Sequence, residues 1–267
     1  MASPTPTPSP AQALNISTRL RVEAGNNVLI GGFIITGNEP KSVAVRGIGP
    51  SLAAFGINDV LLDPTLELHA ANGGLIVQND DWQDNPAQAS QLSALGLAPQ
   101  DSKESGIVAT LPPGAYTAIV AGKNNGAGVG LVEIYDTNQG ADSRLANIST
   151  RGLVQAGSNV MIGGFILGGS SNTRIAVRGL GPSLGLNPLL ADPTLELHDG
   201  DGALLVANDN WQDDPATAAE LASFGLALQD PNESGIFTSL PPGAFTVIVT
   251  GKNGGTGVGL VEIYNVN

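Results

Sequence analysis

The sequence contains one unit twice. DPTLELH at 63–69 recurs unchanged at 192–198, and GVGLVEIY at 128–135 recurs at 257–264. The offset between the copies is 132 residues at Ser51 and 129 residues from Asp63 onward. The copies therefore differ by three residues in length within the segment from Ala53 to Leu62. We expect this segment to be a loop, because strands and helices rarely absorb a change in length.

Each copy is large enough to enclose its own hydrophobic core. Solenoid repeats of roughly 20 to 50 residues cannot do so, whereas units of about 100 to 150 residues commonly can. We therefore predict two domains, 14–138 and 139–267, preceded by a Pro/Thr/Ser-rich linker or tail at 1–13. The tail contains SPTPTPSP, a tract typical of extended spacers between extracellular domains, which favours a piece of a longer surface protein.

Short apolar and β-branched runs, separated by Gly, Pro, Asn and Asp, predict about eight strands in each copy. In the first copy the expected strands are 16–22, 28–36, 42–46, 65–69, 75–78, 106–111, 116–121 and 129–135. One short helix is expected at 86–95, with its twin at 215–224, because each begins with Pro and ends before Gly. The predicted fold class is all-β: two tandem antiparallel β-sandwich domains, jelly-roll-like, with one short helix each.

Charge and composition exclude several classes of partner. The net charge is −13 with only 11 Lys and Arg, and no basic run is present, which argues against binding to nucleic acid. No apolar stretch approaches the roughly 18 residues of a membrane span, so we expect no membrane insertion. The absence of cysteine excludes disulfides and thiolate chemistry.

A resemblance to a known family covers somewhat over half of the chain. From DPTLELH through LIVQNDDW, ESGI and LPPGAYTAIVAG to GVGLVEIY, the sequence resembles bacterial β-sandwich modules of the pre-peptidase C-terminal type, over 63–136 and 192–265. The preceding block with NISTR, GGFIITG and VAVRGIGPSL resembles tandem repeats of large bacterial cell-surface proteins. Both resemblances imply a secreted or cell-surface bacterial accessory domain, and neither supplies catalytic residues.

The Asn-Asp segment after the fifth expected strand is a candidate metal site. Clustered carboxylate and amide oxygens on a loop suit a hard cation such as Ca²⁺. The candidate ligands are Asn79, Asp80, Asp84, Asp101 and Glu104 in the first copy, and Asn208, Asp209, Asp213, Asp230 and Glu233 in the second. The alternative is structural, because Asn and Asp also cap helices and fold loops through bonds to the backbone. No cofactor is required under that interpretation.

The tryptophans are candidate ligand-binding residues. Trp82 and Trp211 occupy matched positions in this polar segment, each followed by a glutamine, Gln83 or Gln212. A loop aromatic beside polar groups can stack on the apolar face of a sugar. It can equally anchor the loop to the edge of a sandwich, and the sequence leaves both interpretations open.

An arginine at the end of an apolar strand needs an acidic partner, because an unpaired buried charge is costly. Arg46 and Arg178 are in this position. The candidate partners are Glu133 and Glu262, or Glu67 and Glu196, all in neighbouring expected strands. We predict structural ion pairs.

No pattern combines a nucleophile, a base and oxyanion donors, so we do not expect an enzyme. We predict a non-catalytic extracellular structural or adhesive module that assembles into fibres by strand donation or end-to-end stacking. Its partners would then be further copies of the chain or other cell-surface components. The alternative is a carbohydrate-binding accessory module of a secreted enzyme or adhesin, dependent on Ca²⁺, with a glycan as partner.

Overall fold

The computed structural model describes residues 12–25 and 27–266. These residues form a mostly antiparallel β structure with few helices, which confirms the predicted all-β class. Most of the predicted tail at 1–13 lies outside the described residues, and its last two residues, Gln12 and Ala13, begin the first strand. Within the described residues, no helix is both long and apolar enough to span a bilayer.

The two repeats contain the same elements in the same order. In the first repeat the strands are β1 (Gln12–Val22), β2 (Leu29–Gly37), β3 (Lys41–Ile48), β4 (Pro64–Ala70), β5 (Leu75–Asn79), β6 (Ser105–Leu111), β7 (Gly114–Gly122) and β8 (Gly128–Asp136). In the second they are β9 (Ser143–Val154), β10 (Met161–Gly168), β11 (Thr173–Leu180), β12 (Pro193–Asp199), β13 (Leu204–Asn208), β14 (Ser234–Leu240), β15 (Gly243–Gly251) and β16 (Gly257–Asn265). The helices α1 (Pro86–Ala94) and α2 (Pro215–Ser223) follow the fifth strand of each repeat.

The local sequence explains these elements. In β4, Leu66 and Leu68 are buried while Thr65 and Glu67 are partly exposed, as the alternation of a strand predicts. The side chain of Asn85 accepts bonds from two backbone N–H groups of the first turn of α1, and a proline occupies its first position. Gly73 and Gly202 have φ angles of 79° and 83° in the hairpins after β4 and β12, which other residues adopt with difficulty.

The length difference between the repeats involves a short helix as well as a loop. The 3₁₀ helix η1 (Pro50–Phe55) has six residues, whereas its counterpart η3 (Pro182–Leu184) has three. The expectation of a loop alone was therefore wrong in part. A 3₁₀ helix absorbs such a change because its few hydrogen bonds are local.

Within each repeat the strands pair in a nested order. β1 pairs with β8, β2 with β7, β3 with β6 and β4 with β5, all antiparallel, and the second repeat repeats this order. Further pairs of β3 with β8 and β4 with β7 join these ribbons. One repeat by itself therefore makes two four-stranded sheets, β1-β8-β3-β6 and β2-β7-β4-β5.

The sheets continue from one repeat into the other. β1 pairs with β10 and β2 with β9, so that Ile16 lies opposite Phe165 and Phe33 opposite Ile148. The result is two eight-stranded layers, β6-β3-β8-β1-β10-β15-β12-β13 and β5-β4-β7-β2-β9-β16-β11-β14, which are linked into one 16-stranded sheet where β1 also pairs with β9 at Ala13 and Leu145. This differs from the expected tandem of separate sandwiches, because β1 and β2 would each have one unpaired edge in an isolated repeat. The predicted domain limits stay a prediction, since the sheets cross them.

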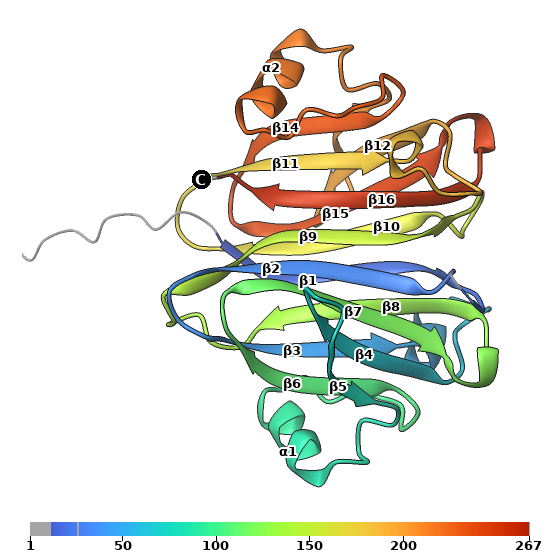
Figure 1. Cartoon of the computed structure of the whole chain (residues 1–267), viewed down its shortest axis with the longest axis vertical. Helices are drawn as coiled ribbons and strands as arrows, with labels where there is room; N and C mark the ends of the chain where they lie inside the picture. The colour runs from blue at the N-terminus through green and yellow to red at the C-terminus, as the bar shows by residue number, and fades with distance from the viewer. Residues whose placement is uncertain (1–11, 26, 267) are drawn as a thin grey trace, which may run out of the picture.

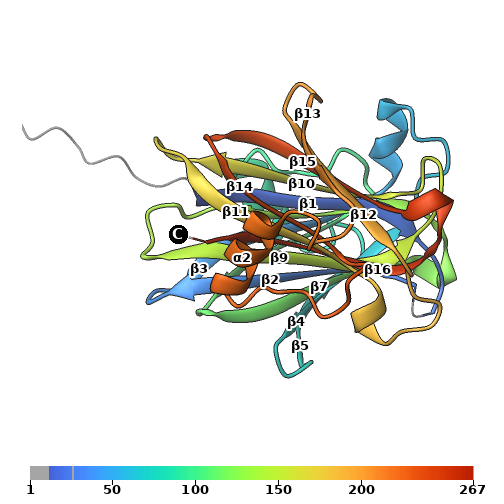
Figure 2. The same cartoon turned by 90° about the horizontal axis from the view of Figure 1, so that it is seen from above.

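The core is also shared. A single buried cluster contains apolar side chains of both repeats, among them Phe33, Ile148 and Phe165. At the middle of the joint, the buried hydroxyls of Thr18 and Thr150 lie 2.7 Å apart. The two helices lie at opposite ends of the long axis (Figure 1). The β4–β5 and β12–β13 hairpins project on opposite sides of the body (Figure 2).

Candidate functional site

The loop between β5 and α1 contains the Asn-Asp segment. The side-chain oxygen of Asn79 accepts a bond from the N–H of Gly106 at 2.8 Å, and its amide donates to the carbonyl of Asp81 at 3.0 Å. The N–H of Trp82 donates to the carbonyl of Glu104 at 2.8 Å. These bonds fold the loop across the start of β6 and hold its two consecutive aspartates beside β4.

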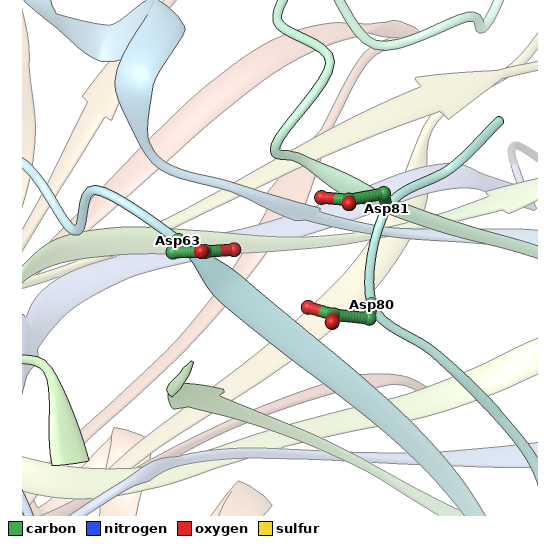
Figure 3. A group of neighbouring side chains, drawn as sticks. All are labelled: Asp63, Asp80 and Asp81. Atoms are coloured by element: carbon green, nitrogen blue, oxygen red, sulfur yellow. The ribbon is translucent and has the colours of Figure 1, made fainter. Parts of the chain in front are cut away.

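Three carboxylates come together there, which we call the acidic cluster: Asp63, Asp80 and Asp81. One oxygen of each lies within 4.8 Å of the others, and Figure 3 shows the side chains pointing toward one another from β4 and the loop. The Oδ1 atom of each is buried and has no hydrogen-bond partner. These are the residues that could hold a cation.

Two lysines already accompany the acidic cluster. Nζ of Lys123 lies 2.5 Å from Asp80, and Nζ of Lys103 lies 3.5 Å from Asp81 and 4.0 Å from Asp63. The hydrogen bond to Asp80 is the main cause that raises the pKa of Lys123. Three carboxylates and two ammonium groups leave a net charge of −1.

The corresponding site in the second repeat has fewer charged side chains but the same net charge. Asn210 and Asn232 stand where the first repeat has Asp81 and Lys103. The remaining pair, Asp192 and Asp209, is bridged by a single lysine, whose Nζ lies 3.6 and 2.6 Å from them. An acid and a base were therefore replaced together, which again leaves a net charge of −1.

This balance limits what the acidic cluster can bind. The affinity of a Ca²⁺ site depends on the number of charged ligands and on the freedom of their oxygens. A cation would have to displace an ammonium group that forms short contacts. In its present form the cluster ties the turn η2 (Lys123–Asn125) to the loop after β5, and the pair Lys252–Asp209 ties the turn η4 (Lys252–Gly254) to the loop after β13.

Glu104, a predicted metal ligand, has a different role. Its side chain is fully buried. One oxygen accepts bonds from the N–H and hydroxyl of Ser51 and from the N–H of Gly49, at 3.0 to 3.1 Å for the two N–H groups. The other accepts from the N–H groups of Gln100 and Asp101, both at 3.2 Å. The carboxylate thus joins three loops, and its oxygens are already used.

The other predicted ligands are mostly engaged as well. Glu233 bonds to the backbone after β11 as its twin does after β3. Asp101 and Asp230 each accept a backbone N–H two residues ahead, at 2.9 Å. Of the predicted ligands, only Asp80 and Asp209 lie among the clustered carboxylates. One metal shell including Asn79, Asp84, Asp101 and Glu104 stays a prediction; in the structure the side chains of Asn79, Asp101 and Glu104 already accept backbone N–H groups.

Asp63, Asp81 and the lysines are not among the predicted ligands. A signal is present in the sequence, since DPTLELH and the segment Gly-Lys-Asn occur in both copies. By themselves these motifs indicate only a strand and a turn. Pairing of β4 with both β5 and β7 is what brings them together.

The tryptophans anchor the loops. The indole N–H of Trp82 donates to the carbonyl of Asp101 at 3.1 Å, and that of Trp211 donates to Asp230 at 3.2 Å. Trp211 is 9% exposed and packs in an apolar cluster beside α2. Stacking on a sugar needs an exposed ring face, which this indole lacks. The adjacent amides are exposed: Gln83 and Gln212.

The arginines lie opposite glutamates in the neighbouring strand. Arg46 is paired across β3 and β8 with Glu133, to which its Nε donates at 2.8 Å. Its guanidinium also donates to the carbonyl of Leu97 at 3.1 Å and lies over the ring of Tyr135. Glu67, the other candidate partner, bonds instead to the histidine two residues ahead at 2.8 Å.

The second repeat has the same ion pair. Arg178 donates to Glu262 at 2.8 Å and to the carbonyl of Leu226 at 3.2 Å. Burial, and next the charge of the adjacent glutamate, raises the pKa of Tyr135 and of Tyr264 to about 12. Each ion pair joins two strands to the loop that follows a helix.

A hollow of about 490 Å³ opens beside the acidic cluster. Its charged lining groups are carboxylates: Glu67, Asp80 and Asp84. The remaining lining residues are uncharged: Thr65, Leu66, Gln78, Asn79 and Asn85. The hollow is polar and acidic, which does not favour an anionic ligand.

Comparisons with known proteins identify no family. No family model and no curated protein matches the chain. Among solved structures, a DUF4785 family protein from Legionella pneumophila is 9% identical, with 100% of this chain and 90% of that chain covered and a TM-score of 0.22. An oxalate decarboxylase of Bacillus subtilis is 5% identical, with 94% and 69% covered and a TM-score of 0.17. The collagen adhesin of S. aureus is 7% identical, with 96% and 77% covered and a TM-score of 0.15. Similarity at this level carries no argument about function.

Proposed function

We propose that this chain is a non-catalytic structural module, secreted or at a bacterial cell surface, that associates with further copies of itself. The observation that carries the proposal is the joint between the repeats, where β1 pairs with β10 and β2 with β9. Separate domains on a linker usually move relative to each other. A body with continuous sheets and one core does not bend at that point, which suits a load-bearing or spacing element.

The polar groups that could carry chemistry support the same proposal. The carboxylates beside β4 are paired with lysines, and Glu104 is used by backbone N–H groups. The Arg46–Glu133 pair crosses two strands and reaches a loop carbonyl. These contacts stabilise the fold; the arginine–glutamate pair recurs in the second repeat, where Glu233 keeps the bonds of one carboxylate oxygen and a single lysine pairs with two aspartates.

Two measurements test this function. Light scattering coupled to size exclusion, from micromolar to millimolar protein, should show a mass that rises with concentration, and negative-stain microscopy should show elongated particles. Thermal unfolding should show one transition, because the repeats share a core. A chain that stays monomeric throughout this range would contradict the self-association, and two separate transitions would contradict the single rigid body.

A further inference from the structure

The two long sheets have four outer edges, and these edges are not equivalent. Along the pairing order they are β6 and β13 in one sheet, and β5 and β14 in the other. Edge strands present unpaired N–H and C=O groups, so native proteins usually cover them or place charges on them. The edges at β6 and β14 differ in this respect from those at β5 and β13.

The helices cover β6 and β14. The side-chain oxygen of Gln88 in α1 accepts a hydrogen bond from the N–H of Val108 in β6, at 3.1 Å. Leu92 of α1 is fully buried and packs so close to Gly106 that a Cβ there would lie 2.6 Å from it. Leu221 of α2 packs in the same way against Gly235 in β14. A further strand therefore cannot add to these edges without removing a helix.

No strand among the described residues pairs with the outer edge of β5 or β13. Within that part of the chain, β5 pairs only with β4, and β13 only with β12. Leu75 and Ile76 at the start of β5 are 52% and 43% exposed, and Leu204 and Leu205 of β13 are 55% and 43% exposed. Consecutive strand residues point to opposite faces, so both faces of each strand end are in water. The projecting hairpins in Figure 2 are these strands.

Neither open edge has a charge or a proline. The strand sequences are LIVQN for β5 and LLVAN for β13, and they are identical at three of five positions. Each is therefore chemically suited to the other. The fold already uses edge-to-edge antiparallel pairing to join its own repeats, at β1 with β10 and β2 with β9.

We propose that β5 of one copy pairs antiparallel with β13 of a second copy, extending the sheets from molecule to molecule. This inference rests on the proposed self-association and names its surface. The two open edges belong to opposite repeats and opposite sides of the body, so the contact is head-to-tail and does not close into a dimer. Chains of molecules, with one free β5 and one free β13 at their ends, are the expected product.

Charge sets the conditions for this contact. The net charge of −13 makes separate copies repel each other, whereas the contacting strands are neutral. Salt screens such long-range repulsion, with a Debye length of about 10 Å at 0.1 M, but weakens hydrogen bonds and apolar contacts little. Association should therefore strengthen with ionic strength, the opposite of an interface built on ion pairs.

Complementation between two variants of the full chain tests the pairing. Leu75→Lys blocks β5 and leaves β13 free, while Leu204→Lys blocks β13 and leaves β5 free. In sedimentation velocity, each variant alone should remain monomeric, and their equimolar mixture should form dimers and no longer species. The double variant should remain monomeric even when mixed with either single variant. Phe55→Lys, at a 76% exposed position in η1 and outside both edge strands, should assemble like the wild type.

The outcomes separate this inference from the proposed function. If the wild type never associates, both fail together. If the wild type associates but the lysine variants do so equally, the module self-assembles through another surface and only the β5–β13 pairing is wrong. Dimers of Leu75→Lys alone would overturn the head-to-tail geometry in favour of β13 pairing with itself. Matching melting temperatures of the variants and the wild type show that the variants are folded.

Discussion

The buried ion pair between Lys41 and Asp136 gives the sharpest test of the structure. Lys41 is fully buried, and its Nζ lies 2.9 Å from a carboxylate oxygen of Asp136 and 2.7 Å from the carbonyl of Asn138. The other carboxylate oxygen accepts the N–H of Asn138 at 2.9 Å. The second repeat has Thr173 and Asn265 at these positions, where the hydroxyl donates to the amide oxygen at 2.9 Å. At equivalent positions the first repeat thus has a charged pair and the second repeat has a neutral, hydrogen-bonded pair.

These two pairs predict the free energies of unfolding in a double-mutant cycle. Lys41→Thr leaves a carboxylate buried without a counter-ion, and breaking such a pair costs about 3 to 5 kcal/mol. Because Asp136 keeps the N–H of Asn138, we expect the lower end, about 3 kcal/mol. Asp136→Asn leaves the ammonium group unpaired and should cost a similar amount. The double variant recreates the neutral pair of the second repeat and should lie within about 1 kcal/mol of the wild type.

Denaturant unfolding at neutral pH, followed by circular dichroism, measures the four free energies. The expected coupling between the two substitutions is then several kcal/mol, far above the roughly 0.5 kcal/mol of independent sites. If Lys41→Thr alone costs less than about 1 kcal/mol, the lysine is not buried as described. If the costs simply add in the double variant, the two side chains are not partners.

Three further predictions concern the loops, the tyrosines and the acidic cluster. Glu104→Gln should lower the free energy of unfolding by about 2 kcal/mol or more in denaturant titrations, because an amide cannot accept from all the N–H groups that the carboxylate satisfies. An unchanged denaturation midpoint would show that this carboxylate does not hold the loops together. The melting temperature should stay constant up to about pH 10 and fall toward pH 12. In the folded chain the pKa of Tyr135 and Tyr264 is about 12, against 10.0 ordinarily, so the unfolded chain loses these protons first. Replacing both tyrosines by Phe should reduce this fall, and an equal fall in the variant would show that other groups cause it. The melting temperature should be the same in excess chelator and in excess Ca²⁺, because lysines already pair with the acidic cluster. If Ca²⁺ raises the melting temperature and Asp80→Asn abolishes this rise, the metal displaces the lysine ammonium groups.

Local patterns were enough to locate most strands. Short apolar runs separated by Gly and Asn predicted strands at 65–69 and 75–78, within a residue or two of β4 and β5. Proline at the start and glycine after the end predicted α1 equally well. These signals act over a few residues, so the sequence shows them directly.

Side-chain partners were harder to predict, because they depend on which strands become neighbours. The register of β3 with β8 selects Glu133 as the partner of Arg46, whereas sequence reasoning left Glu67 equally open. The acidic cluster needs β4 between β5 and β7, which places Asp63 and Lys123 together although 60 residues separate them. From the sequence, Glu104 was a candidate metal ligand. Its partners are backbone N–H groups of distant loops, which local sequence patterns do not show.

The sequence by itself determined that the chain is all-β, that one unit occurs twice, and which residues alternate between core and surface. Those properties follow from composition and short-range periodicity. Only the tertiary structure decided that the two units share their sheets, because an edge strand can pair with any free edge and its sequence does not specify which one. The same physical fact leaves β5 and β13 available to another copy, after β1, β2, β9 and β10 have satisfied one another within the chain.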